Sequence, residues 1–158
     1  MLLRRRTFAA ACALFAFAVG CSDSTGPGGS DPAGDTFAAS LGVNISSMTK
    51  KSDALYIQDL VAGSGAVASA GHGLSVTYTG WLTNGTQFDS NVGKAPLPFT
   101  LGIGQVIPGW DQGLVGMRVG GTRRLVIGSA LAYGSDGRPP AIPGNATLVF
   151  TVTLLSVQ

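Results

Sequence analysis

The chain has 158 residues, which leaves room for one folded domain and some additional segments. Its ten basic and eight acidic side chains give a net charge of +2, and three of the basic ones lie within the first six residues. Without those three, seven basic and eight acidic side chains remain, a net charge of −1. This near-neutral remainder excludes the positive surface that a nucleic-acid-binding protein needs.

The N-terminus has the pattern of an export signal. Arg4, Arg5 and Arg6 precede an apolar run over residues 7–19, which is shorter than the roughly 20 residues of a membrane-spanning helix. We therefore expect a secretory signal peptide over residues 1–20. The sequence Arg5-Arg6-Thr7-Phe8 also matches a twin-arginine signal, so the export route stays open.

The signal ends in Ala18-Val19-Gly20-Cys21, which resembles the lipobox of bacterial lipoproteins, with cleavage before Cys21 and acylation of its thiol. Cys12 leaves with the signal, so the mature chain has one thiol and no internal disulfide. Each buried methylene of a lipid contributes about 0.8 kcal/mol to membrane anchoring. We expect a periplasm-facing lipoprotein of the cell envelope, with Ser22 favouring the outer membrane; plain signal-peptidase cleavage is the alternative.

Residues 22–35 consist of Ser, Asp, Thr, Gly, Pro and Ala, a composition that predicts a flexible tether. Hydrophobic residues reappear over residues 36–51, where we expect a lead-in that is partly ordered at best. We assign residues 21–50 to tether and lead-in, residues 51–158 to the folded domain, and the whole to a monomer. The hydrophobic positions of the lead-in are Phe37, Leu41, Val43, Ile45 and Met48.

Short strands separated by glycines follow. Leu74, Val76 and Tyr78 alternate with polar residues, which is typical of a half-buried strand. Asn84-Gly85 is a hairpin signal, so the next strand should return antiparallel. The predicted strands are 55–61, 74–82, 86–90, 97–101, 122–127 and 146–157.

One stretch has helical spacing instead. Pro108 suits the first position of a helix, and Gly116 and Gly120 should end it after about two turns. Such a short helix is marginal alone and must be buried against a sheet. We therefore predict an α+β fold, with an antiparallel sheet of about five strands wrapped around one short helix. The helical apolar positions are Ile107, Trp110, Leu114 and Met117.

Aromatic residues from separate segments surround a pocket in which we place one carboxylate, that of Asp89. No His, Cys and Glu cluster has metal-ligand spacing, and the chain contains no glutamate. The pattern therefore favours the wall of one apolar pocket over a metal site or a catalytic base. The segments are VTYTG (76–80), the Phe88-Asp89 pair, VIPGWDQGL (106–114), AYG (132–134) and ATLVFTVTLL (146–155).

In order and spacing these segments resemble the FK506-binding-protein (FKBP) family of peptidyl-prolyl cis/trans isomerases, over about residues 55–157. The resemblance implies the FKBP fold, isomerase activity on proline-containing polypeptides without cofactor or metal, and macrolides such as FK506 or rapamycin as ligands. The residues that match the family's proline-binding positions are Tyr78, Phe88, Asp89, Phe99, Val106, Ile107, Trp110, Tyr133, Ile142 and Phe150.

The chain departs from the commonest family pattern in two loops. Arg138 stands where the best-known members carry a histidine, and Ala141 replaces the first of two adjacent isoleucines. The loop after residues 88–90 is about one residue shorter and offers Val92, Gly93 and Lys94 in place of the usual arginine.

The resemblance also implies roles. Trp110 forms the floor under the pyrrolidine ring, the Ile107 N–H and the Tyr133 hydroxyl hold substrate carbonyls, and Asp89 either polarises the twisted amide or fixes Tyr78 and Tyr133. For Asp89 the alternative is a turn residue that closes a hairpin strand. The remaining residues are walls and rim: Tyr78, Phe88, Phe99 and Phe150, then Val106 and Ile142.

Three functions remain open at this point. The first is an isomerase that assists the folding of exported proteins, the second a proline-segment binder or chaperone without turnover, and the third a structural lipoprotein. Outside the pocket we interpret His72 as an exposed linker residue, and Arg118, Arg123 and Arg124 as solvated strand and loop ends, with an anion site as the alternative for the three arginines.

Overall fold

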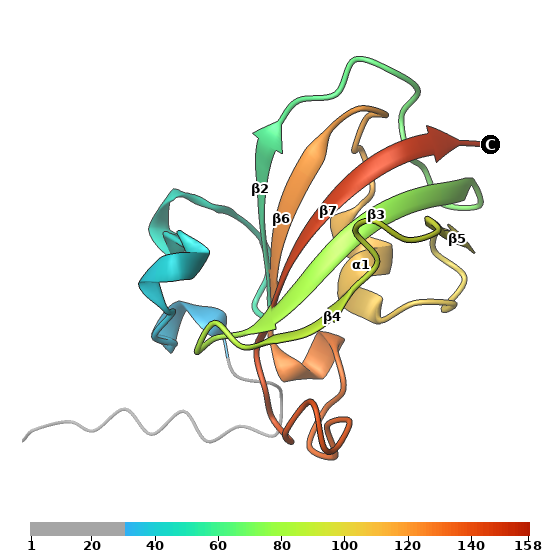
Figure 1. Cartoon of the computed structure of the whole chain (residues 1–158). Coiled ribbons are helices and arrows are strands. Elements are labelled where there is room, and N and C mark those ends of the chain that lie inside the picture. The colour runs from blue at the N-terminus through green and yellow to red at the C-terminus, as the bar shows by residue number, and fades with distance from the viewer. Residues whose placement is uncertain (1–30) are drawn as a thin grey trace, which may run out of the picture.

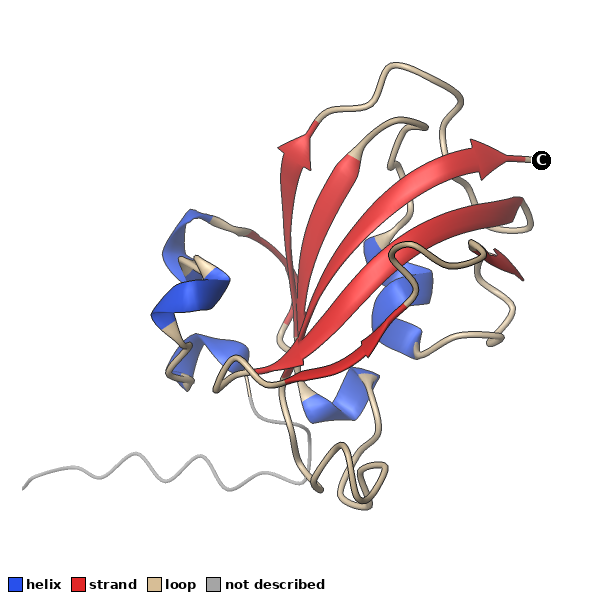
Figure 2. Cartoon of the chain, in the orientation of Figure 1, coloured by secondary structure: helices blue, strands red, loops and turns tan. Residues whose placement is uncertain are grey.

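The computed structural model describes residues 31–158, so the predicted signal peptide, Cys21 and the first part of the tether lie outside the described residues. An antiparallel sheet of seven strands curves around one short helix (Figures 1 and 2). The strands are β1 (Thr49–Ser52), β2 (Leu55–Val61), β3 (Gly73–Leu82), β4 (Gln87–Ser90), β5 (Leu97–Thr100), β6 (Thr122–Ile127) and β7 (Leu148–Val157). The helix is α1 (Pro108–Gly113).

The strand order is β1-β2-β6-β7-β3-β4, and β5 pairs with β3. This confirms the predicted α+β fold with an antiparallel sheet, although the sheet has seven strands where about five are expected. The one strand that matches none of the six predicted ranges is β1, which pairs with β2. The predicted hairpin at Asn84-Gly85 joins β3 to β4, and Gly85 has the positive φ of 88° that such a turn requires.

The helix fits closely against the sheet because two glycines face it. A Cβ atom at Gly109 would lie 2.4 Å from Ile127 Cγ2, and one at Gly113 would lie 2.4 Å from Leu125 Cδ2. The six-residue helix makes about 1.7 turns, close to the predicted two, but it ends at Gly113 with Leu114 as its cap, before the predicted stop at Gly116, which adopts a φ of 79°. The main core lies between α1 and this sheet face.

Buried Arg123 ties the end of α1 to the sheet. Its guanidinium forms two hydrogen bonds with the Asp59 carboxylate, at 2.6 and 3.0 Å, and donates to the carbonyl oxygens of Gly113 and Val115. The expectation that Arg123 is solvated is therefore wrong: the residue is 5% exposed. Its side chain satisfies carbonyls that the helix end leaves without partners.

The lead-in is more ordered than its sequence predicts, and so is the end of the predicted flexible tether, residues 31–35. Residues 31–48 form three 3₁₀ turns, η1 (Pro32–Gly34), η2 (Ala39–Leu41) and η3 (Ile45–Ser47), on the sheet face opposite α1 (Figure 1). A fourth turn, η4 (Ser129–Leu131), follows β6. Leu41 and Met48 are buried in a second hydrophobic cluster with side chains of β2, β6 and β7 that point away from the main core: Tyr56, Val126 and Val149.

Polar contacts fasten the segment 31–48 to the domain at two points. Asp31 accepts hydrogen bonds from Lys50 Nζ at 2.7 Å and from the Tyr56 hydroxyl at 2.8 Å. Further along, Arg124 Nη1 donates to the Gly42 carbonyl at 2.8 Å. The lead-in is therefore an ordered part of the domain. No helix among residues 31–158 is long and apolar enough to cross a bilayer.

Candidate active site

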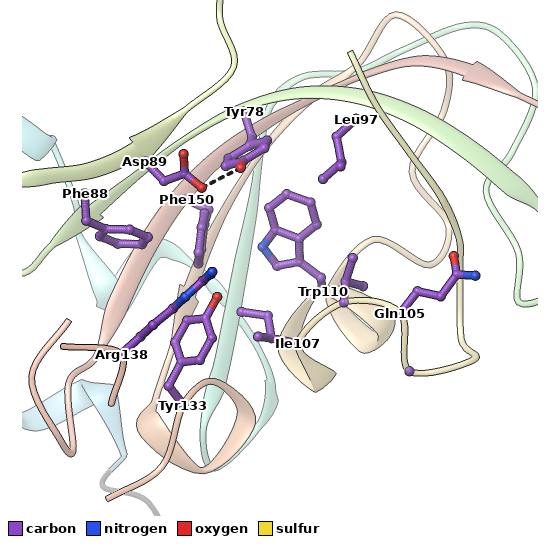
Figure 3. A pocket seen from close by; sticks show the side chains of 12 residues that line it. Tyr78, Phe88, Asp89, Leu97, Gln105, Ile107, Trp110, Tyr133, Arg138 and Phe150 are labelled. Carbon is purple, nitrogen blue, oxygen red and sulfur yellow. Dashed lines mark hydrogen bonds between the residues drawn. The ribbon is translucent and has the colours of Figure 1, made fainter. Parts of the chain in front are cut away.

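A cavity of about 410 Å³ opens between the concave side of the sheet and the loops around α1 (Figure 3). This volume lies within the range of small-molecule sites. Of the ten predicted pocket residues, eight line it: Tyr78, Phe88, Asp89, Val106, Ile107, Trp110, Tyr133 and Phe150. The structure therefore brings together side chains that β3, β4, β7, α1 and two loops contribute.

Trp110 lies at the bottom of this cavity, surrounded by other rings. Its ring centroid lies 5.1 Å from that of Tyr78 and 5.3 Å from that of Phe150, both nearly perpendicular to it. The Phe88 ring meets Phe150 edge-on at 5.5 Å. Such edge-to-face pairs are favourable beyond their buried area and fix ring orientation. The indole is only 3% exposed, yet it forms part of the lining of the open cavity. It can therefore serve as the floor of the cavity.

Gly80 makes room for two of these rings. A Cβ atom there would lie 2.7 Å from Phe88 Cζ and 2.8 Å from Phe150 Cε1. Only a glycine in β3 therefore lets both phenylalanines lie over the strand. The alternation of β3 places Tyr78 and Gly80 on the same face, one as a wall and the other as the gap beside it.

Tyr78 and Asp89 form the one hydrogen bond between side chains of the cavity lining (Figure 3). The Tyr78 hydroxyl donates to Asp89 Oδ2 at 2.6 Å. Desolvation, and then the hydrogen bond and charge of Asp89, raise the pKa of Tyr78 to about 12. The hydroxyl therefore stays protonated and keeps donating at neutral pH. Asp89 itself is exposed, and its position matches the interpretation that it fixes Tyr78.

Two hydrogen-bond donors at the cavity remain available. Within residues 31–158 the Ile107 N–H has no backbone acceptor, because Ile107 caps the start of α1 and only its carbonyl is used by the helix. The Tyr133 hydroxyl reaches the cavity from the loop after β6 (Figure 3) and does not bond to Asp89. The predicted bond between Asp89 and Tyr133 is therefore absent here.

Hydrogen bonds to α1 fix the loop that carries Val106 and Ile107. Asp111 in α1 accepts hydrogen bonds from the N–H groups of Gly102 at 2.7 Å and Gly104 at 2.9 Å. On the other side of the cavity, Asn91 Oδ1 accepts from the Tyr78 N–H at 2.7 Å and fixes the loop after β4. Neither residue is part of the pocket predicted from sequence, because each acts through backbone groups that only the fold brings near.

Phe99 and Ile142 do not line the cavity. Both are buried in the main core, where Phe99 packs against Trp110 with ring centroids 5.9 Å apart. Phe99 therefore supports the floor from inside the core, whereas Ile142 pairs through its backbone with Arg138. The cavity lining instead includes four residues that sequence reasoning did not place in the pocket: Leu97, Gly104, Gln105 and Arg138. Of these, only Arg138 left a signal in the sequence, as a departure from the family pattern.

His72 is exposed, as predicted, and lies outside the cavity. No group of three or more His, Cys, Asp or Glu side chains within residues 31–158 is arranged to hold a metal ion.

Comparison with known proteins gives a family. The model of the FKBP-type peptidyl-prolyl cis-trans isomerase domain matches residues 65–155, more than half of the chain. The FK506-binding protein of Neisseria meningitidis serogroup B is 52% identical over 104 residues, which cover 65% of this chain and 95% of that protein. FK506-binding protein 4 of Rhizopus delemar is 50% identical over 111 residues, but these make up only 29% of its length.

Solved structures agree with this match. The crystal structure of AtFKBP13 superposes with a TM-score of 0.62 at 35% identity, covering 66% of this chain and 93% of that one. A peptidyl-prolyl isomerase of Pseudomonas syringae gives a TM-score of 0.60, also at 35% identity, and 75% of that chain is covered. With its sheet, its aromatic cavity and these matches, the chain belongs to the FKBP-type peptidyl-prolyl cis-trans isomerase family.

Proposed function

We propose that this protein catalyses cis/trans isomerisation of X-Pro bonds in exported polypeptides and thereby assists their folding at the cell envelope. The observation that carries the proposal is an open, ring-lined cavity with the Trp110 face as its floor. Beside that floor lie two unused donors, the Ile107 N–H and the Tyr133 hydroxyl. Family membership supports the reaction, and the N-terminal sequence supports the location.

The physics of the reaction suits such a cavity. Conjugation across the peptide bond sets a rotation barrier of about 18–20 kcal/mol. Halfway through the rotation the nitrogen lone pair no longer conjugates with the carbonyl, so the amide is less polar than in the ground state. An apolar surface disfavours the more polar ground state and favours the twisted form. An acceleration of about 10⁵ needs close to 7 kcal/mol of such differential stabilisation.

Roles for single residues follow from their positions. The pyrrolidine ring stacks over Trp110, and the Ile107 N–H and Tyr133 hydroxyl donate to carbonyls on either side of the proline. Asp89 holds the Tyr78 hydroxyl, so the Tyr78 ring keeps its place against Trp110. In this mechanism no proton leaves a side chain, and positioning does the work.

The location rests on residues 1–21. An acylated Cys21 would attach the domain through the nine residues that separate it from Asp31, the first described residue. At about 3.5 Å per residue such a tether spans at most about 35 Å. The domain would therefore work close to the membrane, on polypeptides that emerge there. A macrolide such as FK506 would occupy the same cavity and compete with proline substrates.

A protease-coupled assay on a proline tetrapeptide tests catalysis. We expect cis/trans exchange of the peptide to be much faster than the uncatalysed exchange, which takes seconds to minutes. FK506 should inhibit this acceleration. An unchanged rate together with measurable peptide binding would leave a proline-segment binder instead of an enzyme.

Mass spectrometry of the mature N-terminus tests the anchor. We expect a diacyl or triacyl cysteine as the first residue, and loss of membrane association in Cys21→Ser while isomerase activity persists. An unmodified terminus at another residue would rule out the lipoprotein proposal and leave the isomerase proposal intact.

A further inference from the structure

Arg138 places a positive charge in the wall of a cavity that is otherwise lined mainly by rings and aliphatic groups. Its guanidinium end reaches the space between Tyr133 and Phe150 (Figure 3). The ion pairs found within residues 31–158 belong to Lys50 and Arg123, and none involves Arg138. The charge facing the cavity is therefore free to meet a ligand.

The backbone beneath this side chain is firmly held. The Arg138 N–H donates to the Ile142 carbonyl at 2.7 Å, and the Ile142 N–H donates to the Arg138 carbonyl at 3.0 Å. Ile142 in turn is 3% exposed and anchored in the main core. Gly137 has a φ of 64°, and a Cβ atom there would lie 2.5 Å from the Ile142 carbonyl oxygen, so the backbone at Gly137 packs directly against that of Ile142.

The positive charge of Arg138 also acts on the hydrogen-bonded pair Tyr78 and Asp89. Desolvation and Asp89 raise the pKa of Tyr78 to about 12, while the charge of Arg138 acts on the same hydroxyl in the opposite direction. Asp89 is the one acid in the cavity lining, and it already accepts the Tyr78 hydrogen bond. A peptide carboxylate would therefore find its complement at Arg138.

We propose that Arg138 forms a carboxylate-binding subsite, so that the protein prefers proline segments with Asp or Glu directly beside the proline. The proposal rests on the proline-binding function proposed above and adds its substrate class. A planar guanidinium can bind a carboxylate through two parallel hydrogen bonds, which a lysine cannot reproduce. Since Arg138 is exposed at the cavity mouth, the preference is modest, about twofold to fivefold.

The test uses two peptide pairs, one with Glu or Gln before the proline and one with Glu or Gln after it. NMR exchange spectroscopy gives kcat/KM without a coupling protease, and NMR titration gives Kd whether or not turnover occurs. We expect the Glu peptide of at least one pair to bind twofold to fivefold more tightly. The advantage should shrink at 0.5 M salt because screening weakens exposed charge pairs.

Variants locate the effect. In Arg138→Gln the Glu/Gln ratio should fall to about one, and in Arg138→Lys part of it should remain. Arg118→Gln removes the same charge from an exposed position outside the cavity and should keep the full ratio. A ratio of one in both pairs with the native protein, or an unchanged ratio in Arg138→Gln, would overturn the subsite. Absence of exchange with the binding ratio intact would instead refute catalysis and leave the subsite standing.

Discussion

Replacing Gly109 by alanine tests whether the closeness of α1 to the sheet sets the geometry of the site. The new Cβ atom would lie 2.4 Å from Ile127 Cγ2, and ordinary contact begins at 3.4 Å, so helix and strand must separate by about 1 Å. Ile127 is fully buried and cannot yield by swinging outward. Alanine gains at most about 1 kcal/mol of helix propensity, whereas overpacking costs about 1–3 kcal/mol.

With the full gain subtracted, the balance predicts a loss of up to about 2 kcal/mol in the free energy of unfolding, measured by urea denaturation. Trp110 and Ile107 flank this glycine closely, so a 1 Å shift displaces floor and donor together. We expect kcat/KM to fall by tenfold or more, since misplacements of this size cost up to about 100-fold. Gln112→Ala, at an exposed position of the same helix, is the matched control. Native stability and turnover in Gly109→Ala would refute the argument.

Three further predictions concern other parts of the molecule. Asp89→Val leaves the Tyr78 hydroxyl without its acceptor and should lower kcat while FK506 still binds. Asp89→Asn should retain more activity than Asp89→Val. Equal turnover in the native protein and in both variants would remove Asp89 from the mechanism. Because the pKa of Tyr78 is raised to about 12, its stabilising effect should be complete below pH 10 and lost as the pH rises to 12. Since the group is partly solvated, this loss should be about 1 kcal/mol or less relative to Tyr78→Phe in pH-dependent unfolding. Leu41→Ala should cost about 2–3 kcal/mol of stability with kcat/KM unchanged, because Leu41 packs on the sheet face opposite the cavity; a matching loss of activity would show that the two faces are coupled.

Local signals predicted much of the fold. The strands at 55–61 and 122–127 occur with the predicted bounds, and Asn84-Gly85 forms the predicted hairpin. Both follow from short-range physics: alternation sets the strand, and the positive φ of Gly85 sets the turn. The start of the helix at Pro108 is likewise predictable from the neighbouring sequence. The end of the helix is not predictable in this way, because the contacts of Gly113 with the sheet depend on tertiary packing.

The lead-in shows what local signals cannot supply. Its hydrophobic residues have no strand or helix period, so the sequence alone favours partial order. Their partners are Tyr56, Val126 and Val149, residues on the outward side of strands, which lie 8–112 positions further along the chain. In the same way Asp111 and Asn91 act on backbone amides across loops, and no residue pattern announces such contacts. The sequence predicted those residues of the candidate site that are aromatic and lie in segments with a recognisable pattern.

The floor of the cavity is positioned by packing alone. The indole N–H of Trp110 is buried and has no hydrogen-bond partner within residues 31–158, so no polar contact sets the angle of the ring. Tyr78, Phe99 and Phe150 surround it, and their own positions depend on the Asp89 bond and on the space above Gly80. Because the N–H is buried, a proline above the floor meets carbon rather than a donor. A polar ground-state amide gains nothing there, which is the condition for apolar catalysis of its rotation.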